Sequence, residues 1–251
     1  MMINIKKYIF EYLLIIITIA LTVSGFWNIF LGTDAKPTPY QALHVIVNFS
    51  WLFLMLYQLS LIGSNQGAKH QRVGFSILFF GPMLFAHAVL LAIHSAHKGL
   101  VSGQGDFLIV QNVFGTIELG FIILMAFILK KRRKIHGAFL FSTIVLMNGI
   151  SIFFLFLAVA PQLIGYGMYI TLVIGFLFFL KDRRNGWPIL LSGSFFVIND
   201  SIGKLLHKYS LIQPLTEFVG TLPKVMTVTG AFLVLLVGLF TTGVVKKSKA
   251  I

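Results

Sequence analysis

Ionisable side chains lie inside stretches of the chain that are otherwise apolar. His87 and His94 fall within the apolar block 73–97, and Glu118 falls within the block 107–129. Hydrocarbon solvates charged groups poorly, so ionisable residues in membrane-spanning helices commonly mark a site. The spacing of seven residues places His87 and His94 on one helix face, two turns apart. We therefore interpret His87 and Glu118 as candidate catalytic or proton-relay residues.

Histidines on different helices could bind haem b. A low-spin haem needs two axial imidazoles from facing helices, each offering a ring-nitrogen lone pair to the iron. His44 and His94 are expected near one membrane surface, and His70 and His136 near the other. These two pairs would form an electron path across the membrane. The spacing allows this arrangement without requiring it.

A histidine cluster could instead bind a metal ion. His94 and His97 form an H-x-x-H motif on one helix. His87, Glu118 or His44 could complete a nitrogen and oxygen ligand set for zinc or iron. A structural interpretation also stands, because polar side chains in a membrane bridge helices through hydrogen bonds. The sequence has no cysteine, which excludes disulfides, iron–sulfur clusters and thiolate zinc sites.

The elements that would position these side chains are membrane helices. Hydrophobic residues occupy 57% of the 251 positions and charged residues 11%, against about 25% charged in a soluble domain. No segment between the apolar blocks is long enough to form its own core. We expect a single all-α transmembrane domain over residues 1–251, a polytopic helical bundle. Its eight expected helices cover residues 9–31, 42–62, 73–97, 107–129, 137–159, 163–180, 187–206 and 222–244.

The positive charges predict how the helices are oriented. With the N-terminus in the cytoplasm, fifteen of the twenty Lys and Arg residues fall on the cytoplasmic side and five outside. This asymmetry follows the positive-inside rule for eight helices with both termini in the cytoplasm. The net charge of +13 then favours anionic lipid headgroups, not nucleic acid, as the partner. The expected location is a cell membrane, of the prokaryotic plasma-membrane type.

The polar residues are expected to fall at similar depths. At a rise of about 1.5 Å per residue, four of them lie near the middle of the membrane: His87, Glu118, Asn148 and Asp200. The second span adds a polar stripe on one helix face, formed by His44, Asn48, Trp51 and Gln58. Together these positions predict a His/Glu polar chamber that opens outward.

Two short motifs carry a resemblance to known families. They are KHQRVG at 69–74 and the basic run KKRRKIHG at 130–137, which follow His44 in that order. This layout resembles uncharacterised prokaryotic multi-pass families, namely the domain-of-unknown-function family 2306 and one related to cytochrome-oxidase assembly. Both are similar in layout to the transmembrane ascorbate-reducible cytochromes b. The resemblance implies haem-binding roles for His44, His70 and His136. Gln71, between His70 and Arg72, departs from that pattern.

Three functions are compatible with these residues. The leading hypothesis is a small cytochrome-b-like membrane redox or assembly protein. The first alternative is a proton-coupled transporter of a small solute, with His87 and Glu118 as relay groups. The second is a histidine-metal membrane enzyme. The sequence identifies neither a substrate nor a reaction, and it leaves open a membrane-protein partner or a homo-oligomer.

Overall fold

The computed structural model of the chain describes residues 5–33, 35–103 and 105–243. All regular structure in these residues is helical, so the all-α expectation is confirmed. Two 3₁₀ segments, η1 (Ile5–Tyr8) and η2 (Pro161–Tyr166), accompany the α-helices. The α-helices are α1 (Ile9–Gly25), α2 (Trp27–Phe30), α3 (Pro39–Gly63), α4 (Gly67–Gly74), α5 (Ile77–Ser102), α6 (Ile109–Ile128), α7 (Arg133–Val159), α8 (Gly167–Lys181), α9 (Trp187–Lys208), α10 (Ile212–Gly220) and α11 (Lys224–Gly243).

Seven helical segments in the described residues are long and apolar enough to cross a membrane. They are Pro39–Gly63, Ile77–Ser102, Ile109–Ile128, Arg133–Val159, Pro161–Lys181, Trp187–Lys208 and Lys224–Thr242. The remaining apolar helix, α1, has 17 residues. Its length of about 25 Å is less than the membrane core of about 30 Å. The helices support a membrane protein, and seven of the eight expected blocks reach spanning length.

The first expected block, 9–31, is divided into α1 and α2 at Phe26. Gly25 lies against the backbone of α7, where a methyl group would overlap the carbonyl oxygen of Ser151. The hydroxyls of Thr22 and Ser151 are 3.0 Å apart at the same contact. Glycine permits this close approach but supports a helix weakly, which explains why α1 ends there.

The block expected at 73–97 also differs from the structure. Residues 67–74 form the separate helix α4, and α5 begins at Ile77 and continues to Ser102. Gly103 ends α5 with a φ of 68°, a left-handed conformation that favours glycine at a helix C-terminus. His97 therefore lies within α5, not at its end.

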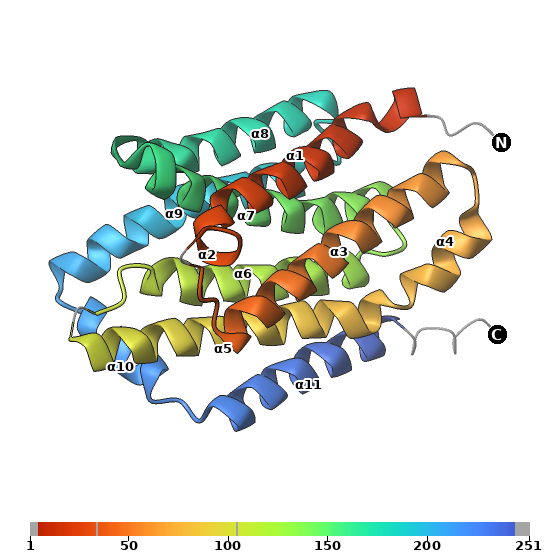
Figure 1. The fold of residues 1–251 in the computed structure, drawn as a ribbon. Coiled ribbons are helices and arrows are strands. Elements are labelled where there is room, and N and C mark those ends of the chain that lie inside the picture. Colours follow the sequence, from red (N-terminus) through yellow and green to blue (C-terminus); the bar gives the residue numbers. More distant parts are fainter. Residues whose placement is uncertain (1–4, 34, 104, 244–251) are drawn as a thin grey trace.

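The long helices run up and down the bundle, and the start of α1 and the end of α11 lie at the same end of it (Figure 1). We call this the terminal end; it holds helix α4 and the loops 129–132 and 182–186. The opposite end, which holds the loops 31–38 and 103–108 and helix α10, is the chamber end. Helix α7 lies at the centre and contacts α1, α6, α8 and α9. Its buried Phe139, Ile144 and Val145 join Trp51 of α3 in the core.

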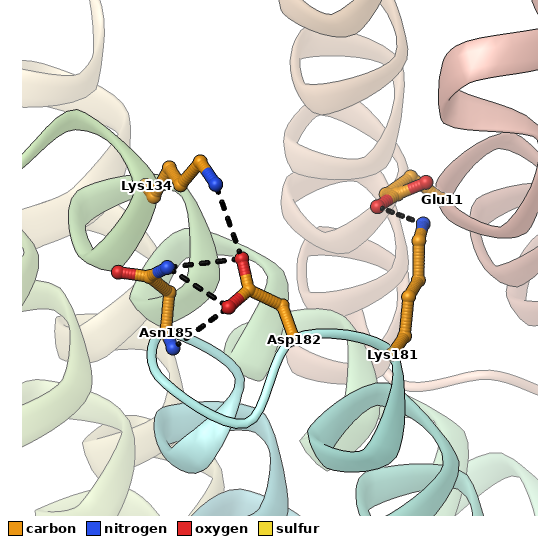
Figure 2. A network of polar contacts seen from close by, with 5 residues as sticks. All are labelled: Glu11, Lys134, Lys181, Asp182 and Asn185. Carbon is orange, nitrogen blue, oxygen red and sulfur yellow. Dashed lines mark hydrogen bonds and ion pairs between the residues drawn. The ribbon is translucent and has the colours of Figure 1, made fainter.

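Ion pairs connect the helices at the terminal end (Figure 2). Lys181 Nζ lies 2.7 Å from Glu11 Oε1, which ties α8 to α1. Lys134 Nζ lies 3.4 Å from Asp182 Oδ2, and the Asn185 side chain donates to both oxygens of Asp182 at 2.9 Å. These hydrogen bonds, followed by the neighbouring Lys134, lower the pKa of Asp182.

Candidate functional site

A cavity of about 900 Å³ occupies the chamber end of the bundle, and we call it the chamber. It is lined by residues of α1, α3, α5, α6, α7, η2, α8 and α9, of the segment 26–30 and of the loops that precede α3 and α6. Exposed Lys36 and Lys98 are among them, so the chamber reaches the surface. Apart from these two lysines, the main polar residues of the chamber wall are His44, Asn48, His94, Gln111, Asn112, Thr116, Glu118 and Asp200.

The start of α3 positions its part of the chamber. Thr38 and Gln41 form a capping box, with Thr38 N donating to Gln41 Oε1 at 2.8 Å and Gln41 N to Thr38 Oγ1 at 3.3 Å. Pro39 follows at the first helical position, where a missing N–H has no cost. Two turns further, Asn48 Nδ2 donates to the backbone carbonyl of His44 at 2.9 Å. The cap fixes where α3 begins, and His44 and Asn48 of this helix both lie in the chamber wall.

The imidazoles lie along the contact between α3 and α5. His44 packs against His87 with ring centroids 5.5 Å apart, and Tyr40 packs against His94 at 4.9 Å. Both ring nitrogens of buried His87, and Nδ1 of His44 and of His94, have no hydrogen-bond partner within the described residues. Leaving a buried polar atom unpaired costs about 1–3 kcal/mol. Such atoms are expected where water or a ligand completes the hydrogen bonding.

A polar network joins α6 to α9 beside the chamber. Asn199 Nδ2 donates to Glu118 Oε2 and to Gln111 Oε1, each at 3.2 Å. Glu118 forms no ion pair among the described residues, which leaves its carboxylate stabilised mainly by an amide. The sequence analysis did not single out Gln111, although it precedes Glu118 by seven residues and so shares its helix face. This arrangement suits a group that takes up and releases a proton.

The outer histidine pair lies along the contact between α3 and α5. His44 and His94 belong to adjacent helices and lie at different levels of this contact, one beside His87 and the other beside Tyr40. A haem bound between His44 and His94 stays a prediction from the sequence.

The inner pair, His70 and His136, lies at the terminal end, where His136 is close enough to affect the pKa of His70. Burial lowers the pKa of His70, and nearby His136 lowers it further. His136 Nδ1 lies 2.7 Å from the carbonyl oxygen of Ala126, which requires a proton on that nitrogen. The Gln58 side chain contacts both His70 and Gly74. We assign its oxygen to the Gly74 N–H at 2.8 Å, which leaves its amide nitrogen to donate to His70 Nδ1.

These contacts set complementary tautomers in the inner pair. His136 keeps a lone pair on Nε2, whereas His70 accepts at Nδ1 and so carries its proton on Nε2. An axial haem ligand needs a free lone pair on the coordinating nitrogen. His136 meets this requirement and His70 does not while Gln58 keeps this orientation. The inner pair is better suited to passing a proton than to holding iron.

The expected metal ligands are not grouped by the fold. No set of three or more His, Asp or Glu residues within the described ranges is close enough to hold a metal ion. His97 is exposed, whereas His94 lines the chamber. His87, His44 and Glu118 lie near the chamber but supply no such set. The metal hypothesis thus has no structural support in the residues described.

The described part of the chain is thus a helical membrane-type bundle with a polar chamber. Comparison with models of protein families, with curated proteins and with solved structures returned no match.

Proposed function

We propose that the protein is a proton-coupled membrane transporter whose chamber binds a small solute. One observation carries the proposal: three helices bring His44, His94 and Glu118 to a single chamber that opens at the surface. Its volume of about 900 Å³ falls within the range of about 300–1,000 Å³ found for small-molecule sites. Functional ionisable residues within membranes line such cavities.

We further propose eight spans, with both termini in the cytoplasm. The terminal end carries the basic segments KKRRK at 130–134 and KDRR at 181–184, as the positive-inside rule requires of cytoplasmic loops. In this orientation the chamber faces outward and the ion pairs of Figure 2 lie on the cytoplasmic side. The location would be a cell membrane whose cytoplasmic leaflet supplies anionic headgroups.

Glu118 is the proposed proton-binding group. In a largely apolar surrounding without a nearby cation, a carboxyl group is more stable in its neutral, protonated form than as a carboxylate. Asn199 can donate to the ionised form at the observed contact of 3.2 Å. His87, whose ring lies against that of His44, is the proposed relay to the rest of the bundle.

The test is solute-driven proton uptake in proteoliposomes that contain the purified protein and a trapped pH dye. We expect at least one solute from a panel of carboxylates, amines, amino acids and sugars to acidify the interior. Glu118→Gln should abolish this signal, whereas Glu217→Gln, an exposed acid at the same end of the bundle, should retain it. If folded protein moves no protons with any solute in the panel, the transporter proposal fails.

The cytochrome-b-like redox or assembly role is the alternative proposal. The resemblance around His70 and His136 supports it, and the free Nε2 lone pair of His136 offers one ligand. A visible spectrum of protein expressed with added haem, before and after dithionite, tests it directly. A Soret band that sharpens on reduction and disappears in His136→Ala would establish this role; a colourless protein would remove it.

A further inference from the structure

Positive charge surrounds the mouth of the chamber. Lys36 and Lys98 line the cavity and are exposed. Lys224 lies nearby: its ammonium is 5.9 Å from the ring centroid of Tyr40, the ring that packs against His94 of the chamber wall. Two lysines thus line the chamber, and a third lies close to its wall.

These lysines are not neutralised by carboxylates of the described chain. The ion pairs among the described residues involve other lysines. They join Lys134 with Asp182, Lys181 with Glu11 and Lys204 with Asp200. Asp200, which lines the chamber, is held by Lys204 at 2.6 Å. Unpaired positive charge at the mouth of a low-dielectric cavity attracts anions and raises their local concentration.

The interior of the chamber has an apolar part as well as a polar one. Its polar residues come mainly from α3, α5 and α6, whereas its aromatic and methionine side chains come mainly from the segment 26–30, α7 and α8, with Phe107 before α6 and Phe196 on α9. Phe26 and Phe154 pack with ring centroids 4.7 Å apart, and Phe153 lies 5.4 Å from Phe154. This surface suits an apolar group, because covering it removes apolar area from water.

We propose that the ligand of the chamber is a small carboxylate with an apolar body, bound together with a proton. The carboxylate lies near the lysines of the mouth, and the apolar body contacts the phenylalanines. The proton resides on Glu118, which removes the repulsion between its carboxylate and the anion. This inference rests on the proposed transport function, but it concerns the chemistry of the ligand and has its own test.

The test compares three probes with the same body and different charges: phenylacetate, phenethylamine and 2-phenylethanol. Binding to the full-length protein in nanodiscs of uncharged lipid is measured by titration calorimetry. We expect phenylacetate to bind more tightly than the other two, and to bind less tightly as salt is added. The double variant Lys36→Gln/Lys98→Gln should weaken phenylacetate binding about tenfold. Lys208→Gln, which changes an exposed lysine outside the chamber, should leave it unchanged.

Several outcomes would overturn the assignment of a carboxylate ligand. They are tighter binding of phenethylamine, equal binding of the three probes, no binding of any probe, or no effect of the double variant. A thermal unfolding midpoint equal to that of the wild type shows that the double variant is folded.

Two results separate this inference from the transport proposal. Phenylacetate binding with no proton movement in proteoliposomes would leave the ligand class standing and refute the transporter. Proton-coupled uptake of phenethylamine, but not of phenylacetate, would support the transporter and refute the ligand class.

Discussion

The two ends of the bundle treat their polar groups differently. At the terminal end the acids are paired: Glu11 with Lys181, and Asp182 with Lys134. The Gln58 amide is used in full, since it donates to His70 and accepts from Gly74. At the chamber end, by contrast, imidazole nitrogens of His44, His87 and His94 have no partner within the described residues. Within the same residues, the lysines of the mouth form no ion pair with a carboxylate.

The difference is what we expect if the terminal end mainly stabilises the fold and the chamber end binds the proposed ligand. Paired groups contribute to stability, whereas unpaired buried groups reduce it and persist where a ligand or water completes them. If the chamber opens to both sides of the membrane in turn, contacts at the terminal end must break. The closed terminal end and the open chamber would then be one of two states of a transporter.

The largest expected effect comes from filling the chamber. Gly115 lines it and has open space where a Cβ would be added. Gly115→Leu should therefore abolish proton-coupled uptake, by about a hundredfold or more, because the side chain occupies the ligand site. Its thermal unfolding midpoint should not fall, since leucine favours a helix over glycine by about 0.5–1 kcal/mol. Uptake in proteoliposomes and thermal unfolding in detergent measure the two effects.

A glycine between two packed helices provides the opposite case. A Cβ on Gly175 of α8 would meet the carbonyl oxygen of Ile189 and the Cα of Leu190 on α9. Gly175→Ala should lower the free energy of unfolding by about 1–3 kcal/mol, because the helices must move apart. A stable Gly175→Ala protein, or an unstable Gly115→Leu protein, would contradict the contrast between an open chamber and close helix packing.

An amide at the terminal end should matter for stability, not for binding. Gln58→Leu keeps the volume of this buried side chain but removes the donor to half-buried His70 Nδ1 and the acceptor for the Gly74 N–H. We expect a loss of about 1–3 kcal/mol in the free energy of unfolding. Gln213→Leu is the matched control, because its hydrogen bond to Glu217 is exposed; there the change should stay within about 0.5 kcal/mol. Equal unfolding midpoints for the two variants would argue against our assignment of the Gln58 amide.

The sequence predicted the helices better than the contacts between them. A bilayer requires long apolar segments, so seven blocks agree with helices of spanning length. The division of 9–31 depends on the close approach of Gly25 to Ser151, which are distant in the chain. The separation of α4 from α5 was likewise not predicted, because residues 73–76 are apolar enough to continue a helix.

For the candidate site, helix periodicity gave the faces but not the partners. The stripe His44, Asn48, Trp51, Gln58 lies on one face of α3, yet its members meet different partners. The first two line the chamber, Trp51 Nε1 donates to Thr143 Oγ1 at 2.8 Å, and Gln58 contacts His70. Which helix faces which depends on the packing of the whole bundle, so the contact of His44 with His87 was not foreseen.

The smallest expected effect concerns the pH dependence of stability at the terminal end. Hydrogen bonds from Asn185, together with the nearby Lys134, lower the pKa of Asp182 in the folded protein. A lowered pKa contributes stability that is present above the unfolded-state value of about 3.9. This contribution is lost as the pH falls through the folded-state value. Since these side chains are exposed, we expect Asp182→Asn to cost at most about 1 kcal/mol at pH 7.

The same contribution should disappear in acid. The unfolding midpoints of wild type and Asp182→Asn should differ near neutral pH and converge as the pH falls below the unfolded-state value of about 3.9 and through the lowered folded-state pKa. Thermal unfolding in detergent at both pH values measures this convergence. A difference that persists unchanged in acid would show that Asp182 acts through its neutral hydrogen bonds. Hydrogen bonds from an amide side chain would then stabilise the terminal end, as those of Asn199 do beside the chamber. The two ends would differ only in the unpaired imidazoles and lysines of the chamber end.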